Sequence, residues 1–212
     1  MTKILVVRHG HAEGNAEHRF IGQTDVPLDE LGREQAQSLA GRLTNEPIDR
    51  IVSSDLRRAI DTISPLATKL GVPIELDRRL REISNGEWSG LLPTEISARW
   101  ADLWTAYRSG VDVVRPGGER WGQVRVRAIA AVDDAAVHGG TVLVCTHGGP
   151  ALCLAQWAAG HPVGGNIFLG RLAAVANASI TTIELPPLRL AGFNDVGHLG
   201  AGVDLRLPFE PR

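Results

Sequence analysis

The stretch KILVVRHG, residues 3–10, joins a run of aliphatic residues directly to an arginine, a histidine and a glycine. Its first five positions, 3–7, have the β-branched and aliphatic composition of a buried strand. A second stretch of the same design, TVLVCTHGG at residues 141–149, places another buried strand immediately before a histidine and two glycines. Ligands of open α/β sheets bind beyond the carboxyl ends of the strands, so we expect both histidines at a binding crevice.

Helical and strand-like patterns alternate along the rest of the chain. Apolar residues at helical spacing predict helices over 29–43, 56–70, 124–137 and 151–159. Strand-like runs lie at 3–7, 48–53, 72–76, 141–146, 179–184 and 188–193. The last two runs flank Pro186-Pro187 and could form a hairpin. This alternation predicts an α/β fold, a three-layer sandwich in which helices flank a mostly parallel central sheet.

One segment, about 91–121, departs from the alternation. It is rich in aromatic residues and ends in Pro116-Gly117-Gly118. We expect it to be a small helical cap insertion that packs over the crevice. The chain has no internal repeat and no low-complexity linker, so residues 1–212 are expected to form a single domain around that insertion.

Composition excludes several classes of protein. The 212 residues are 43% hydrophobic and carry a net charge of −2, which gives the molecule no electrostatic reason to bind nucleic acid or a membrane surface. No apolar run approaches about 20 residues, and the N-terminus lacks the pattern of a signal peptide. Cys145 and Cys153 are spaced too widely for a redox pair and are expected to be reduced core thiols. These features predict a cytoplasmic protein.

The residues at the first strand end indicate a site for an anionic substrate. Arg8 beside His9 combines a planar guanidinium, which suits an anionic substrate, with a nitrogen nucleophile. Gly10 allows a ligand to approach the backbone closely. A lone histidine would more often cap a turn, but this combination at a strand end favours a functional role.

Further motifs follow in a fixed order, and together they are far more specific than any one of them. They are Arg8-His9-Gly10 with Asn15; Phe20-Ile21-Gly22-Gln23-Thr24-Asp25 through Pro27-Leu28-Asp29-Glu30-Leu31-Gly32; Ser53-Ser54-Asp55-Leu56-Arg57-Arg58-Ala59 with Thr62; Leu80-Arg81-Glu82 with Gly86, Trp88 and Gly90; Thr146-His147-Gly148-Gly149; and Asn194-Asp195 with His198-Leu199. Over nearly the whole chain this order resembles the histidine phosphatase superfamily, also called the phosphoglycerate mutase-like family. One departure is Gly10-His11-Ala12, where the family often has Gly-Glu-Thr or Gly-Glu-Ser.

The resemblance implies a role for each central residue. His9 would attack phosphorus and form a transient phosphohistidine, while Arg8, Arg58 and His147 would surround the phosphoryl oxygens. Glu82 would protonate the leaving group and then activate water. No metal and no cofactor is implied.

Two of these assignments have a competing neighbour. Arg57 and Arg58 both lie on the polar side of their helix, and the family pattern selects Arg58 because it directly precedes alanine. Glu87 is the local alternative to Glu82.

Other residues receive weaker assignments. By analogy, Asn15, the backbone around Ile21 and Gly22, and the Gly148 N–H would contact phosphate or substrate. His11 lies two residues from the nucleophile and could line the pocket. The remaining histidines have no metal-ligand spacing; they are His18, His138, His161 and His198. Four arginines of the insertion could bind a second anionic group, although solvation at the surface is the better expectation for each; they are Arg99, Arg108, Arg115 and Arg120.

The preferred functional hypothesis is a histidine acid-type phosphatase, a phosphoric monoester hydrolase acting on a small phosphorylated metabolite. A phosphoglycerate mutase is the first alternative, since it uses the same residues, but the short, tryptophan-rich insertion favours a phosphatase. A non-catalytic phosphate-binding regulatory protein is a second alternative. A dinucleotide-binding module is disfavoured because no GxGxxG motif follows the first strand. The late strands over 179–193 could also pair between the subunits of a homodimer.

Overall fold

A computed structural model describes residues 1–15, 17–161, 172 and 174–200. Its strands are β1 (Thr2–Arg8), β2 (Arg50–Ser53), β3 (Ile74–Leu76), β4 (Gly140–Thr146), β5 (Ile180–Leu185) and β6 (Arg189–Asp195). Its α-helices are α1 (Glu30–Leu43), α2 (Arg57–Leu70), α3 (Pro93–Arg99), α4 (Ala101–Arg108), α5 (Trp121–Ala136) and α6 (Gly148–Ala158). Two single 3₁₀ turns, η1 (Arg78–Leu80) and η2 (Gly86–Trp88), lie between β3 and α3.

The six strands form one sheet in the order β3-β2-β4-β1-β5-β6. The first four strands run parallel, whereas β5 and β6 form the antiparallel hairpin expected across the two prolines. The mostly parallel sheet is therefore confirmed. Arg8 at the end of β1 is paired with Thr146 at the end of β4, and the His9 N–H donates to the Thr146 carbonyl at 2.8 Å. This register brings the two histidine motifs to the same edge of the sheet.

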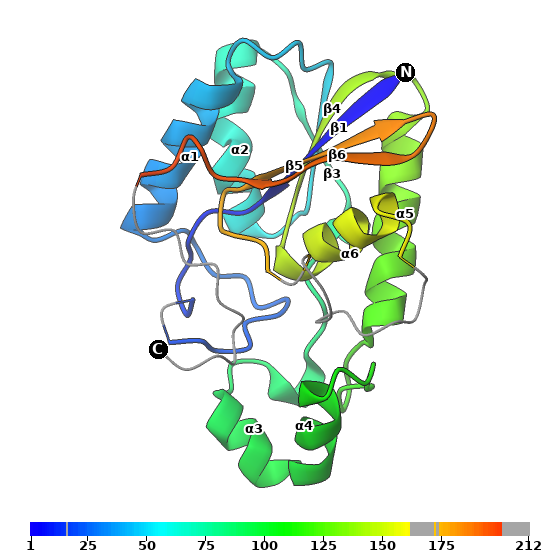
Figure 1. The fold of residues 1–212 in the computed structure, drawn as a ribbon. Coiled ribbons are helices and arrows are strands. Elements are labelled where there is room, and N and C mark those ends of the chain that lie inside the picture. Colours follow the sequence, from blue (N-terminus) through cyan, green and yellow to red (C-terminus); the bar gives the residue numbers. More distant parts are fainter. Residues whose placement is uncertain (16, 162–171, 173, 201–212) are drawn as a thin grey trace.

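Successive side chains of the central strands pack alternately on the two faces of the sheet, and helices cover both faces. Leu5 and Val7 of β1 belong to one buried cluster with residues of α1 and α2, while Ile4 and Val6 belong to another with α5 and α6. Successive side chains of a strand point to opposite faces, so an aliphatic strand buries both faces of the sheet at once. Figure 1 shows α1 and α2 on one side of the sheet and α5 and α6 on the other. The expected three-layer arrangement is confirmed.

Two helices begin three residues earlier than the apolar spacing predicted. Helix α6 starts at Gly148, with Pro150 in its first turn as expected, because its two leading glycines carry no helical signal of their own. Helix α5 starts at Trp121, which was expected to lie in the insertion. Its first turn is held by a remote carboxylate: Asp112 accepts from the N–H groups of Trp121 at 2.7 Å and Gly122 at 2.9 Å. Local sequence cannot reveal a carboxylate from another segment that accepts hydrogen bonds from the first N–H groups of a helix.

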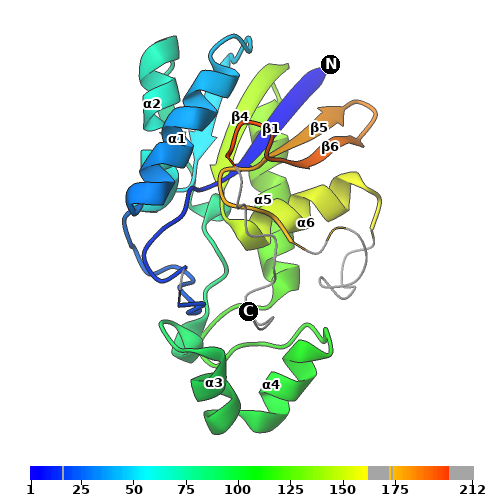
Figure 2. The same ribbon diagram turned by 60° about the vertical axis from the view of Figure 1, so that its left-hand side comes forward.

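The insertion contains helices α3 and α4, which lie beyond the carboxyl ends of the parallel strands, at the opposite end of the molecule from the N-terminus (Figures 1 and 2). An aromatic cluster joins these helices to the loop that follows β1: Phe20, Trp88, Ile96, Trp104, Tyr107 and Val113. Neighbouring rings in it meet mostly edge to face, as aromatic pairs prefer. Across the described residues, no helix is long and apolar enough to cross a membrane.

Candidate active site

A cavity of about 230 Å³ opens where the parallel strands end. Eight of the nine residues expected in the site line it: Arg8, His9, Asn15, Ile21, Gly22, Arg58, Glu82 and Gly148. The ninth, His147, is fully buried and lies directly behind His9, with the two ring centroids 5.0 Å apart. The fold thus gathers segments that are far apart in the sequence around one small space.

The hydrogen bonds of His9 fix which of its ring nitrogens carries the proton. Its Nδ1 lies 2.7 Å from the Gly10 carbonyl, and its Nε2 lies 3.2 Å from Nε of Arg58. A carbonyl only accepts and a guanidinium only donates, so Nδ1 carries the proton and Nε2 presents its lone pair. Burial lowers the pKa of His9 well below its ordinary value, and the positive charges of Arg58 and Arg8 lower it further. The imidazole is therefore neutral at physiological pH, the form that acts as a nucleophile.

Arg58 is almost fully buried, with 2% of its surface exposed. Its terminal nitrogens donate to the carbonyls of Thr24 at 2.8 Å and Gly22 at 2.7 Å, which aims the guanidinium at His9. Burial lowers its pKa to about 10, so it keeps its charge at neutral pH. Arg57 is exposed and pairs with Asp61 on the same helix. Tertiary position thus separates two arginines that helical periodicity left equivalent.

His147 lies behind His9, at the end of the cavity that Arg8 and Arg58 line. Its Nε2 lies 2.9 Å from the Ser54 hydroxyl, and its Nδ1 has no hydrogen-bond partner among the described residues. Burial, followed by the charge of Arg58, lowers its pKa well below the ordinary value. Arg8 extends along the cavity wall, and its guanidinium donates to the Val175 carbonyl.

Glu82 lies across the cavity at the N-terminus of α6. Its Oε2 accepts from the Gly149 N–H at 3.2 Å, and its Oε1 accepts from the Ile83 N–H at 2.9 Å. A Cβ on Gly149 would lie 2.4 Å from Oε1 of Glu82 and 2.3 Å from the Trp121 ring, so only glycine allows this approach. Glu87, the alternative acid, is exposed and does not line the cavity.

These arrangements agree with comparisons to known proteins. Residues 4–190 match the family described as histidine phosphatase superfamily (branch 1). The chain belongs to this superfamily. It is 35% identical over 216 residues to glucosyl-3-phosphoglycerate phosphatase from Mycolicibacterium vanbaalenii, covering 97% of this chain and 92% of that protein. It is 39% identical over 154 residues to phosphoglycerate mutase-like protein 4 from Arabidopsis thaliana, covering 70% and 67% of the two chains. The solved structure of Bacillus stearothermophilus YhfR superposes with a TM-score of 0.87 at 30% identity, covering 94% of this chain and all of that one.

An arginine that the sequence reasoning missed holds in place residues 79–84, called the acid segment because it carries Glu82, the expected acid. Arg127 of α5 donates to the Glu82 carbonyl at 2.9 Å and to two further carbonyls of the same segment. It also pairs with Glu119 at 3.0 Å, and Glu119 accepts from the Ser84 N–H at 2.8 Å. The pair therefore clamps the main chain on both sides of the Glu82 side chain. Neither residue carries a local signal, because their partners lie far away in the sequence.

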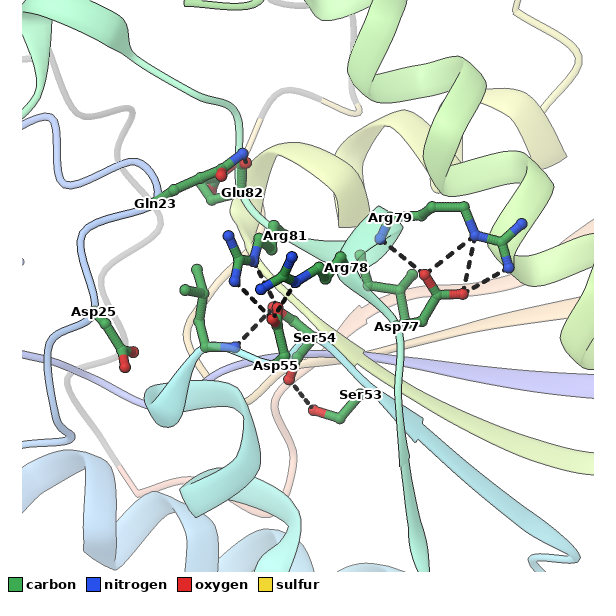
Figure 3. Close-up of polar contacts among 12 residues, drawn as sticks. Gln23, Asp25, Ser53, Ser54, Asp55, Asp77, Arg78, Arg79, Arg81 and Glu82 are labelled. Atoms are coloured by element: carbon green, nitrogen blue, oxygen red, sulfur yellow. Dashed lines mark hydrogen bonds and ion pairs between the residues drawn. The ribbon is translucent and has the colours of Figure 1, made fainter.

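The opposite side of the acid segment has its own supports. Gln23 donates to the Glu82 carbonyl at 3.0 Å, and Figure 3 shows the two residues side by side. Two arginines, Arg81 at 2.6 Å and Arg78 at 3.2 Å, bind the carboxylate of Asp55 at the end of β2. The loop that carries Glu82 is thus fastened to the sheet as well as to α5.

On the side of the insertion, the cavity is lined mainly by aromatic side chains. Phe20, Tyr107 and Trp121 bring aromatic surface to the cavity. Arg115 also lines it and is fully buried, so the expectation that this arginine is solvated at the surface was wrong. Burial among aromatic rings from three separate segments cannot be recognised from composition. Arg99, Arg108 and Arg120 are exposed, as expected.

His11, the residue that departs from the superfamily motif, has a hydrogen-bond partner. The His11 Nδ1 hydrogen-bonds the carboxylate of Asp29, the residue that caps α1 by accepting from the Gly32 N–H at 2.9 Å. His11 lies at the cavity wall, as the sequence suggested, and so does His18.

The described residues were also compared with what a metal site or a redox-active thiol would require. No cluster of three or more histidine, cysteine, aspartate or glutamate side chains in it is placed to hold a metal ion. Cys145 and Cys153 are buried free thiols, as expected. Burial raises the pKa of Cys153 to about 12, which leaves that thiol unreactive.

Proposed function

We propose that this protein is a phosphatase that hydrolyses small phosphomonoesters through a phosphohistidine on His9. The observation that carries the proposal is the buried, neutral His9 imidazole, whose Nε2 accepts from Arg58 in a cavity that Arg8 and Glu82 also line. The 35% identity to a phosphatase over nearly the whole chain supports it.

The first step transfers the phosphoryl group to the enzyme. Nε2 of His9 attacks phosphorus, an N–P bond forms, and the bond between phosphorus and the ester oxygen breaks. The electron pair leaves with that oxygen, and the Glu82 carboxyl group supplies the proton it needs. Arg58, which donates to Nε2 in the structure described here, transfers its hydrogen bond to a phosphoryl oxygen when the substrate enters.

The second step releases phosphate. Glu82, now a carboxylate, accepts a proton from water as the water oxygen attacks phosphorus. The N–P bond breaks, and its electron pair returns to Nε2 of His9. Because the carboxylate is held by the Gly149 and Ile83 N–H groups, it is in the same position for both proton transfers.

The remaining side chains stabilise charge on the three non-bridging oxygens. Arg8, Arg58 and His147 supply donors. The Nδ1 of His147, which has no hydrogen-bond partner among the described residues, is the atom available for that contact. The Gly148 N–H at the start of α6 adds a helix N-terminus. Asn15 and the backbone at Ile21 and Gly22 complete the binding surface. No step requires a metal ion.

A phosphoglycerate mutase is the second candidate, favoured by the similarity to a mutase-like protein. Such an enzyme would form the same phosphohistidine and pass the phosphoryl group to a second hydroxyl group instead of water. Of the four arginines in the insertion, only Arg115 lines the cavity, so the short cap offers little charge there to retain a phosphorylated intermediate, which favours hydrolysis.

One assay separates these functions. Protein in EDTA is incubated with 3-phosphoglycerate and a trace of the bisphosphate primer, and free phosphate and 2-phosphoglycerate are followed together. We expect phosphate without isomer; isomer without phosphate would establish the mutase. Phosphate binding without turnover of any ester in a wide panel would indicate a regulatory protein. Loss of activity in EDTA that a metal restores would contradict the metal-free mechanism.

We also infer a cytoplasmic setting and a small phosphorylated metabolite as substrate. Two buried free thiols support this setting. Pairing of two subunits through the β5–β6 edge remains a prediction, which sedimentation analysis would test.

A further inference from the structure

A turn just before β5 contacts the main chain of the nucleophile and takes no part in the proposed reaction steps. Within it, the Asn177 side chain lines the cavity, and its Nδ2 donates to the carbonyls of His9 at 3.0 Å and Gly10 at 3.2 Å. The Ala178 N–H also donates to the His9 carbonyl, at 3.2 Å. An amide nitrogen carries two hydrogens, so the one side chain holds both carbonyls at once.

One of these two carbonyls decides which nitrogen of His9 reacts. The Gly10 carbonyl accepts from Nδ1 of His9 at 2.7 Å, which leaves the lone pair on Nε2. A Cβ on Gly10 would lie 2.8 Å from the Gly32 carbonyl oxygen, so packing requires glycine at this position. Glycine restricts its own backbone least of all residues, and the hydrogen bond from Asn177 therefore supplies the restraint on the Gly10 carbonyl.

The contacts also fix which way the Asn177 amide faces. Both partners of Nδ2 are carbonyl oxygens, which only accept, so the amide oxygen cannot take that position. The N–H groups of the same segment have other partners: the His9 N–H donates to the Thr146 carbonyl at 2.8 Å, and the Gly10 N–H donates to Oγ1 of Thr62 at 2.9 Å. Removal of the Asn177 amide would leave those contacts in place and act on the two carbonyls.

Two residues of the C-terminal motif, Asn194 and His198, hold the turn itself. The Asn194 Oδ1 accepts from the Ala176 N–H at 2.8 Å, and Nε2 of His198 donates to the Ala178 carbonyl at 3.0 Å. Ala178 and Asn194 both have a φ of 55°, a conformation that is uncommon outside glycine. Such a conformation persists where the surrounding structure determines it strongly, and it is frequent next to active sites. The motif thus supports the turn that carries Asn177.

We propose that Asn177 is a positioning residue for the nucleophile. By holding the Gly10 carbonyl, it keeps the proton on Nδ1 of His9 and the lone pair on Nε2. The inference rests on the proposed phosphatase function and adds a residue to it. Asn177 acts on the imidazole and not on the phosphoryl group, so its loss should slow formation of the N–P bond without weakening the binding of phosphate, which depends on Arg8 and Arg58.

The test measures catalysis, phosphate binding and the protonated ring nitrogen separately. Asn177→Ala should lower kcat/KM about 30-fold for an aryl and an alkyl phosphate alike, because a misplaced nucleophile attacks slowly whatever the leaving group. The inhibition constant for inorganic phosphate should stay within about threefold of the wild-type value. ¹⁵N NMR of histidine-labelled protein should show His9 protonated at Nδ1 in the wild type and at either nitrogen in the variant. Signals of His9 are those missing from His9→Ala.

Matched variants separate positioning from support of the fold. Asn177→Asp keeps the shape of the side chain and replaces the donor by an oxygen, so it should lose at least as much activity; it also carries the test if Asn177→Ala does not fold. Asn194→Ala breaks a contact of the same turn without touching His9 or Gly10, and it should lower the Tm but change kcat/KM less than about threefold. Asn45→Ala, at an exposed asparagine, should change neither.

The outcomes distinguish this inference from the function on which it rests. If the wild-type protein hydrolyses no ester, including an aryl phosphate, the proposed function fails, and the NMR comparison, which needs no turnover, decides the role of Asn177. The inference alone fails if folded Asn177→Ala keeps the wild-type kcat/KM, or if both variants at 177 keep His9 protonated at Nδ1. It also fails if Asn194→Ala loses as much activity as Asn177→Ala, or if the loss is confined to alkyl phosphates.

Discussion

The two ends of the cavity are built on different principles. At the sheet end, Arg8, His9 and His147 follow directly from the ends of β1 and β4, so neighbouring parallel strands determine their spacing. At the cap end, Tyr107 and Arg115 come from a helix and a loop that are held together by aromatic packing. The sheet end is cationic and is built on paired strands, whereas the cap end is aromatic with one enclosed charge.

This difference separates the reaction from the choice of substrate. Every phosphomonoester presents the same phosphoryl group, so the sheet end can be constant. Leaving groups differ, and a wall built from an insertion can change without disturbing the strands. Substitutions at the sheet end should therefore abolish turnover of all esters, and substitutions at the cap end should change the preference among them.

The largest expected effect is at the nucleophile. His9→Ala should reduce kcat by about 10⁴-fold or more for every ester, because no other group in the cavity replaces Nε2. Steady-state kinetics on an aryl and an alkyl phosphate measure this loss, and circular dichroism checks the fold. His138→Ala, at an exposed histidine, is the matched control. Turnover close to that of the wild type would disprove the covalent mechanism.

Glu82→Gln should have a large effect that depends on the leaving group. Hydrolysis of an alkyl phosphate should fall about 10²- to 10³-fold, since the leaving alkoxide needs a proton, while an aryl phosphate should lose less than about tenfold. Glu87→Gln, on the exposed side chain nearby, should change neither rate. Equal losses on the two esters would remove Glu82 from the role of acid.

Arg127→Met should reduce hydrolysis less than Glu82→Gln does, but again more for alkyl phosphates than for aryl phosphates. The variant releases three carbonyls of the acid segment and breaks the pair with Glu119, so the Glu82 carboxylate is less well placed. We expect about a tenfold loss on alkyl phosphates and little on aryl phosphates. Arg120→Met, at an exposed arginine before α5, is the control. Losses independent of the leaving group would show that Arg127 only supports the fold.

The smallest expected effect is a dependence of the free energy of unfolding on pH. His9 and His147 have pKa values well below 6.5 because of burial and nearby arginines, whereas in the unfolded chain they titrate near 6.5. Below that pH the unfolded chain takes up protons that the folded protein excludes, so stability falls as the pH drops from about 6.5. Each histidine should contribute about 1 kcal/mol per pH unit.

Urea unfolding at pH 7.5 and pH 5.5 would measure this dependence. His147→Gln should reduce the loss between the two pH values by about half, and His138→Gln, at an exposed position, should leave it unchanged. A stability that does not change over this range would mean that the two histidines accept protons in the folded state.

Much of the sheet end could be predicted from the sequence, because local pattern and function coincide there. The aliphatic runs predict two buried strands, and the residues that follow the runs, Arg8-His9 and His147, indicate which side chains lie at the strand ends. Parallel pairing then places them together at one edge of the sheet. Even here the choice of Arg58 over Arg57 needed a family pattern, because helical periodicity put both on one polar side.

Physical reasons limit what the sequence reveals elsewhere. Local pattern determined the order of elements, the buried strands and the central chemical groups, since these depend on near neighbours in the chain. Only the tertiary structure decided that Arg115 is enclosed by rings, that Arg127 clamps the acid segment, and that Asp112 caps α5. Each of these depends on groups from distant segments meeting at a few ångströms, and that meeting is a property of packing, which no single segment encodes.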